Sequence, residues 1–130
     1  MRISLRAWVF LPLLFAGCGV TREDTILHSR QNYLAAKASC QAAYPTALVA
    51  QSDCRTDAAN RFIRPYYRYP DLMTWVQTKR RLLAARVDAG KMTKAAFDRQ
   101  VAQAEREVAR EETRRNDAEG SENGNAPNLR

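Results

Sequence analysis

Three cysteines and one histidine are the residues of this 130-residue chain best suited to redox or metal chemistry. Cys40 and Cys54 are separated by thirteen residues, whereas dithiol redox chemistry usually uses a C-x-x-C pair at the start of a helix. The only histidine, His28, has no second soft ligand at a spacing typical of metal sites. Cys40 and Cys54 therefore predict a structural disulfide formed in an oxidising compartment, with free thiols as the alternative.

The carboxylates do not form a catalytic constellation in the sequence. Asp24 lies one helical turn before His28, but a single histidine on a polar helix is more often a surface residue than a general base. Glu105 and Glu112 share a face with arginines, so ion pairing is their expected role. Nothing in the sequence places Asp24 and Asp53 in one cleft. We predict no catalytic residue, no metal and no cofactor, and therefore no enzyme activity.

Basic residues are concentrated between positions 55 and 94, where ten lysines and arginines accompany three aspartates, a local charge of +7. Tyrosines are interleaved with them, and such bands bind nucleic acid in cytosolic proteins or phosphorylated lipids, acidic glycans and acidic protein faces elsewhere. The alternative is that the arginines cover helix surfaces and the tyrosines fill the core. The candidate anion-binding residues are Arg64, Arg68, Arg80, Arg81, Tyr66 and Tyr67.

Four helices must position these residues. Apolar residues recur at helical spacing over residues 24–43, 47–63, 71–89 and 93–115, and prolines or a glycine separate these segments. The connector over residues 64–70 contains two prolines and should be extended. The predicted N-caps of the second, third and fourth helices are Thr46, Asp71 and Thr93.

Two helical hairpins account for this pattern. Cys40 and Cys54 lie on apolar stripes that face each other if the first two helices are antiparallel, and the turn around Gly90 joins the last two. Residues 116–130 lack large apolar side chains, so we expect a disordered tail. The predicted fold is all-α: a small bundle of about four helices over residues 24–115, with one disulfide. The expected apolar face of the third helix is formed by Leu72, Trp75, Val76, Leu82, Leu83 and Val87.

The N-terminus has the features of a signal peptide. Two arginines precede an uncharged apolar run over residues 7–16, which is shorter than the roughly 20 residues that span a bilayer. Leu14-Phe15-Ala16-Gly17-Cys18 resembles the lipobox of bacterial lipoproteins, with Phe15 where that family usually has leucine. The resemblance implies removal of residues 1–17, acylation of Cys18, and a lipidated linker over residues 18–23. The alternatives are a secretory signal cut near Ala16, or an uncleaved anchor with a free Cys18.

The same resemblance sets the expected location and role. Residues 55–112 are also similar to segments of small proteobacterial lipoproteins, but this similarity assigns no function to any residue. We therefore expect a cell-envelope protein that faces the periplasm, with a non-catalytic structural or protein-interaction role. Gly19 follows Cys18, where the enteric form of the family uses aspartate for inner-membrane retention, so the outer membrane is the expected destination.

An alternative function is a basic and aromatic module that binds phosphorylated lipid or acidic glycan. The expected partners are the membrane, through the N-terminal lipid, and an envelope protein or an anionic polymer. Nucleic acid is not an expected partner, because the signal peptide directs the chain out of the cytoplasm.

Overall fold

The computed structural model describes residues 21–124, so Cys18, the predicted signal peptide and residues 125–130 lie outside the described part. This part contains four α-helices, one 3-10 turn and no strand. The predicted all-α fold class is confirmed. The elements are α1 (Arg22–Ala43), α2 (Leu48–Phe62), η1 (Arg64–Tyr66), α3 (Pro70–Asp88) and α4 (Lys94–Gly124).

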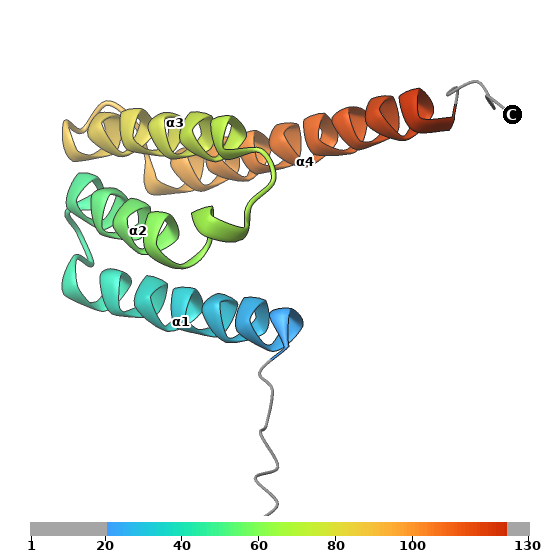
Figure 1. Cartoon of the computed structure of the whole chain (residues 1–130). Coiled ribbons are helices and arrows are strands. Elements are labelled where there is room, and N and C mark those ends of the chain that lie inside the picture. The colour runs from blue at the N-terminus through green and yellow to red at the C-terminus, as the bar shows by residue number, and fades with distance from the viewer. Residues whose placement is uncertain (1–20, 125–130) are drawn as a thin grey trace, which may run out of the picture.

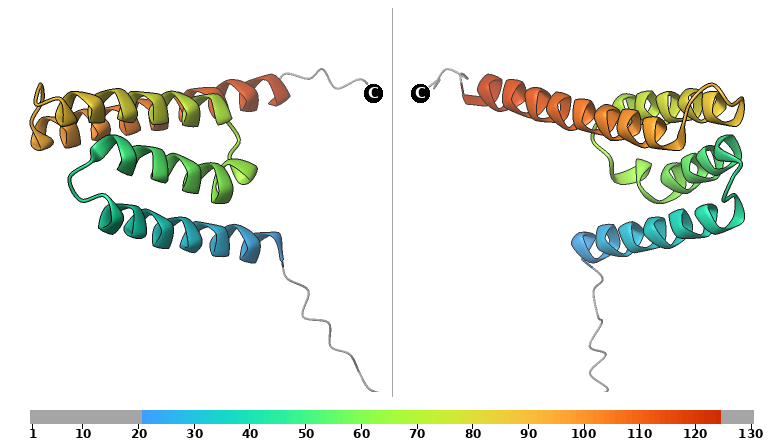
Figure 2. Two further views of the ribbon diagram at one scale, coloured as in Figure 1. Left: turned by 90° about the vertical axis from the view of Figure 1, so that its left-hand side faces the viewer. Right: turned by 180° about the vertical axis from the view of Figure 1, so that it is seen from behind.

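Successive helices run in opposite directions, and each packs against the next (Figure 1). Both predicted hairpins are present, and packing of α2 on α3 joins them into one continuous array. The helix α1 lies at one edge of this array, whereas α3 and α4 lie on the other side of α2 (Figure 2). The start of α1, the end of α2, η1 and the start of α3 share one end of the array, and α4 extends past it (Figure 1).

The apolar core lies between α2, α3 and α4. Its buried members are Leu48, Leu83, Ala84 and Phe97, with Val49, Val87, Met92 and Val101 packed against them. Each large aliphatic or aromatic side chain that is fully buried contributes about 1.5–3 kcal/mol. This small cluster is therefore the main hydrophobic source of stability for α2, α3 and α4.

The apolar face predicted for α3 is wrong at two positions. Trp75 and Leu82 are 42% and 60% exposed, although Leu83 is buried as expected. The buried stripe of α3 includes Gln77 and Arg80, because α2 and α4 contact that side of the helix. Polar side chains therefore occupy positions that a hydrophobic pattern assigns to leucine or valine.

A disulfide joins α1 to α2, as predicted. The Cα atoms of Cys40 and Cys54 are 5.8 Å apart, and Cys40 is the one buried residue of α1. Cross-linking residues about 15 positions apart stabilises a fold by about 3 kcal/mol on the chain-entropy model. Because α1 buries so little else, we infer that the disulfide is the main restraint that holds it on α2.

The helix starts agree only partly with the prediction. The helix α1 begins at Arg22, where Thr21 accepts a hydrogen bond from the Asp24 N–H (3.2 Å) and Asp24 accepts one from the Thr21 N–H (3.1 Å). This capping box holds the pKa of the Asp24 carboxyl below its ordinary value. The predicted cap of α4 is confirmed, because the Thr93 hydroxyl accepts a hydrogen bond from the Ala96 N–H (3.2 Å).

The start of α2 is capped from a distant part of the chain. Thr46 is not its N-cap; Ala47 occupies that position and makes no side-chain hydrogen bond there. Instead the two carboxylate oxygens of Asp88, the last residue of α3, accept hydrogen bonds from the N–H groups of Leu48 and Val49, each at 2.9 Å. One aspartate therefore caps α2 and ties it to the end of α3.

Two further boundaries correct the prediction. Tyr69, not Asp71, is at the N-cap position of α3, and Asp71 lies in its first turn. The helix α4 continues to Gly124, so residues 116–124 are helical although the sequence assigns them to a disordered tail. Contacts of Asn116 and Glu119 with the connector support this extension.

Candidate functional site

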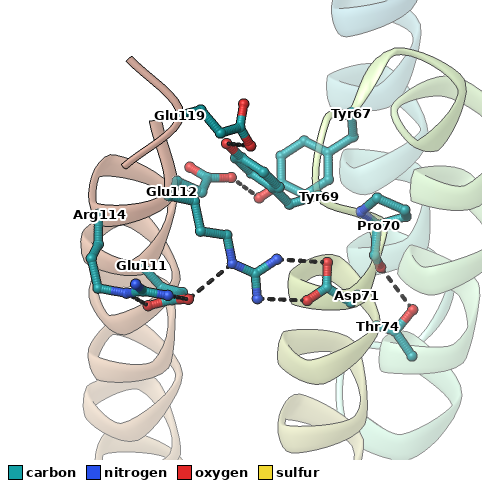
Figure 3. Close-up of polar contacts among 10 residues, drawn as sticks. Tyr67, Tyr69, Pro70, Asp71, Thr74, Glu111, Glu112, Arg114 and Glu119 are labelled. Carbon is teal, nitrogen blue, oxygen red and sulfur yellow. Dashed lines mark hydrogen bonds and ion pairs between the residues drawn. The ribbon is translucent and has the colours of Figure 1, made fainter. Parts of the chain in front are cut away.

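The connector between α2 and α3 packs against the second half of α4 through its tyrosines (Figure 3). The Tyr67 hydroxyl donates a hydrogen bond to the Glu112 carboxylate, and the Tyr69 hydroxyl donates one to Asn116 Oδ1 (2.8 Å). Burial, together with the hydrogen bond to Glu112, raises the pKa of Tyr67 well above its ordinary value. Both phenols are therefore neutral structural groups at physiological pH.

Ion pairs surround the two tyrosines. Arg115 forms a two-pronged pair with Asp71, at 3.0 Å and 2.8 Å, and its Nε donates to Glu111 (2.9 Å). Hydrogen bonds from Arg114 and Arg115 lower the pKa of Glu111 to about 2. Arg68 pairs with the carboxylate of Glu119, which lies one helical turn beyond Asn116 on α4. The cations of this network thus have acidic partners within the chain.

The six predicted anion-binding residues do not converge on one site. Arg80 and Arg81 lie about ten residues along α3 from the connector, a rise of about 15 Å. Arg81 pairs with Asp53 (2.8 Å), and Arg80, whose side chain is 8% exposed, pairs with Glu105 (3.0 Å). These two arginines are therefore held by other helices of the array.

The connector residues divide into bound and exposed ones. Tyr67 and Arg68 contact α4, as described above. Arg64 donates to Asn60 at 3.5 Å and to Thr74 at 3.4 Å, and Tyr66 is 44% exposed. Among the residues that the structure describes, Arg64 has no acidic partner. Of the predicted set, only Arg64 and Tyr66 thus remain exposed and outside the ion-pair network.

The half-buried Arg55 of α2 and the buried Arg80 of α3 lie close enough for their charges to interact, an arrangement that was not predicted. Burial, and secondarily the nearby charge of Arg55, lowers the pKa of Arg80. The Nε atoms of Arg55 and Arg80 are both buried, and neither has a hydrogen-bond partner in the part of the chain that the structure describes. Arg80 is thus a packing element of the interior. In the sequence, the only sign of this burial is that Gln77, Arg80 and Ala84 follow one another at intervals of three and four residues, which places them on one side of the helix.

A shallow apolar groove of about 200 Å³ lies between α3 and α4. It is lined by Leu72, Trp75 and Val108 and by Glu107 and Glu111. The Trp75 ring is 42% exposed, and the ammonium group of a lysine one turn later lies 5.7 Å from it. Exposed tryptophans in apolar depressions are typical centres of protein interfaces.

Other features of the surface offer no convergent chemistry. A larger open hollow of about 810 Å³ beside the disulfide is lined mostly by alanines and by the charged residues Asp53, Asp57 and Arg61. His28 is exposed on α1. Across residues 21–124, no group of three or more His, Cys, Asp or Glu side chains is placed to hold a metal ion. No helix in the same range is long and apolar enough to cross a membrane.

No protein-family model matches the sequence, and searches among curated proteins and among solved structures found no match.

Proposed function

We propose that this chain is a lipid-anchored protein of the cell envelope that acts through non-catalytic contact with another protein. The anchor is supported by the lipobox-like segment that ends at Cys18, which lies outside the described residues. The contact role is supported by one observation, the exposed Trp75 in the groove between α3 and α4.

The groove defines the chemistry of the partner. Leu72, Trp75 and Val108 offer an apolar floor, and burying apolar surface is the main favourable term in most protein associations. Glu107 also lines the groove and has no ion-pair partner among residues 21–124, so its carboxylate favours a partner with a basic side chain, whereas Glu111 already pairs with Arg114 and Arg115. The partner is therefore a protein segment with an apolar side chain flanked by lysine or arginine.

The alternative function, binding of phosphorylated lipid or acidic glycan, has less support. It requires several cations directed at one ligand, whereas Arg68, Arg80 and Arg81 already pair with acidic residues of the chain. Arg64 and Tyr66 remain available for such a role, and that role stays a prediction.

Photocrosslinking in intact cells tests the contact role. A photoreactive phenylalanine derivative in place of Trp75 should yield a discrete covalent adduct with one protein. The same residue in place of Leu82, which is 60% exposed on the same helix, is the matched control and should yield none. Glu107→Lys should lower the adduct yield at position 75, because it reverses the charge of a side chain that lines the groove. Equal yields at positions 75 and 82, or no adduct at 75, would refute the groove as the contact surface.

Acylation tests the anchor. Cys18→Ser removes the thiol that accepts the lipid, so it should abolish lipid labelling and leave an unprocessed precursor. Unchanged labelling of this variant would contradict the lipoprotein proposal. Density-gradient separation of the two membranes then tests the expected outer-membrane location.

A further inference from the structure

The helix α1 carries a stripe of alternating apolar and basic side chains. Leu27, Arg30, Leu34 and Lys37 recur at intervals of three, four and three residues, which places them on one side of the helix. On a helical wheel, Leu27 and Leu34 lie about 140° and 120° from Cys40, the residue bonded to α2. They are 57% and 55% exposed.

The described array leaves the two leucines of this stripe exposed. The helix α1 packs against α2 and lies at the edge of the array in all three views (Figures 1 and 2). Arg30 is exposed and Lys37 half-buried, and neither has an ion-pair partner among residues 21–124. Two exposed leucines that alternate with two cations without ion-pair partners form a surface suited to the headgroup region of an anionic membrane.

Charge is distributed unequally across the array. Residues 25–52, which include most of α1, contain two basic and no acidic residues, whereas residues 105–122 of α4 contain seven acidic and four basic ones. The helices α1 and α4 lie on opposite sides of α2 (Figure 2). The net charge of the first segment therefore attracts an anionic surface, and the net charge of the second repels it.

The position of the expected anchor identifies that surface. Cys18 is three residues before Thr21, the N-cap of α1. An extended chain spans at most about 3.6 Å per residue, so an acylated Cys18 holds Thr21 within about 11 Å of the lipid surface. The helix α1 is thus the part of the array that reaches the membrane first.

We propose that α1 lies along the membrane surface, with Leu27 and Leu34 at the boundary between headgroups and acyl chains and Arg30 and Lys37 on lipid phosphates. This inference rests on the proposed anchor at Cys18. Apolar side chains of interfacial helices enter this boundary, and basic side chains beside them are attracted to anionic lipids. In this orientation α2, α3 and α4 stack away from the bilayer, and the Trp75 groove on α3 and α4 stays free for a protein partner.

Depth-dependent quenching tests the orientation. The acylated chain is reconstituted in vesicles of three parts phosphatidylcholine to one part phosphatidylglycerol, with brominated acyl chains as the quencher. Trp75→Phe removes the one tryptophan that lies outside the predicted signal peptide. In this background, Leu34→Trp should lose at least half of its fluorescence, and the control Leu82→Trp less than a tenth. Adding Arg30→Gln and Lys37→Gln should reduce the quenching at position 34 at least twofold.

Each outcome bears on one part of the proposal. An acylated chain whose tryptophan at position 34 is unquenched, or is quenched no more than at 82, overturns the orientation and leaves the anchor intact. A mass spectrum without acylation of Cys18 overturns the anchor, and the orientation with it. A photoreactive residue at position 34 should capture lipid in cells; capture of a protein instead overturns the membrane contact in favour of a protein interface.

Discussion

Replacing Asp88 by alanine tests whether α2 depends on a cap supplied by α3. The Asp88 carboxylate accepts hydrogen bonds from the N–H groups of Leu48 and Val49, each at 2.9 Å, and Ala47 at the N-cap position contributes none. Removing an N-cap usually costs about 0.5–2 kcal/mol, and hydrogen bonds to charged groups are the stronger ones. Because Leu48 is only 4% exposed, its N–H is poorly placed to find water instead. We expect Asp88→Ala to lower the unfolding free energy by about 2 kcal/mol.

The expected change is large enough to measure. In a domain of about 100 residues, each 1 kcal/mol shifts Tm by about 4–8 °C, so Asp88→Ala should lower Tm by about 8–16 °C. Asp88→Asn keeps one acceptor oxygen and should lose about half as much. The control is Asp98→Asn, which breaks an exposed pair with Lys94 and should cost less than about 0.5 kcal/mol. Circular dichroism during thermal and urea unfolding provides both quantities.

A local cap should restore part of the loss. In the Asp88→Ala background, Ala47→Ser places a hydroxyl at the N-cap position of α2 and should recover about 1 kcal/mol. The reasoning is refuted if Asp88→Ala unfolds within about 2 °C of the unaltered chain. It is equally refuted if Asp98→Asn costs as much.

Three more perturbations have defined outcomes. Replacing Cys40 and Cys54 together by alanine should lower the unfolding free energy by about 3 kcal/mol in urea titrations, and in the unaltered chain both cysteines should resist alkylation until their disulfide is reduced. Glu111 has a folded-state pKa of about 2 against an ordinary 4.5, so its stabilising contribution is complete above pH 4.5 and is lost as the pH falls toward 2. Glu111→Gln should therefore flatten the dependence of urea-unfolding free energy on pH in that window. Arg80→Ala should cost about 2–4 kcal/mol because its side chain is 8% exposed, whereas Arg81→Gln, 57% exposed, should cost less than about 0.5 kcal/mol by the same titration.

The number of helices and their order followed from local sequence. Pro45, Pro70 and Gly90 interrupt segments with helical spacing, and Gly90 adopts a φ of 69°, which favours glycine. The disulfide also followed, because Cys40 and Cys54 fall on stripes that meet when α1 and α2 are antiparallel. These features depend on residues close in the chain, or on one pairing that the hairpin brings together.

The end of α4 and the cap of α2 did not follow from local sequence. Residues 116–124 have no apolar side chain larger than alanine, so no hydrophobic pattern extends the helix, but Asn116 and Glu119 contact the connector, more than 40 residues earlier in the chain. Asp88 likewise caps a helix that begins 40 residues before it. Thr46 offered the better local signal for that cap, and the distant carboxylate replaced it.

The candidate surfaces show the same division. The basic and aromatic character of the connector was visible in the sequence, but pairing of Arg68 with Glu119 depends on where α4 lies. The burial of Arg80 and the exposure of Trp75 are both opposite to the usual preferences of these residue types. Both the burial of Arg80 and the exposure of Trp75 depend on which side of α3 faces α2 and α4.

The sequence by itself determined the all-α architecture, the helix boundaries set by proline and glycine, and the cysteine pair. Helical periodicity and backbone restriction act within a few residues, so they can be recognised without knowing the rest of the fold. The tertiary structure alone decided the partners of the arginines, the cap on α2, the extension of α4 and the exposed sides of α1 and α3. Those depend on which of several similar helix faces pack together, and this choice reflects the burial and charge pairing of the whole array.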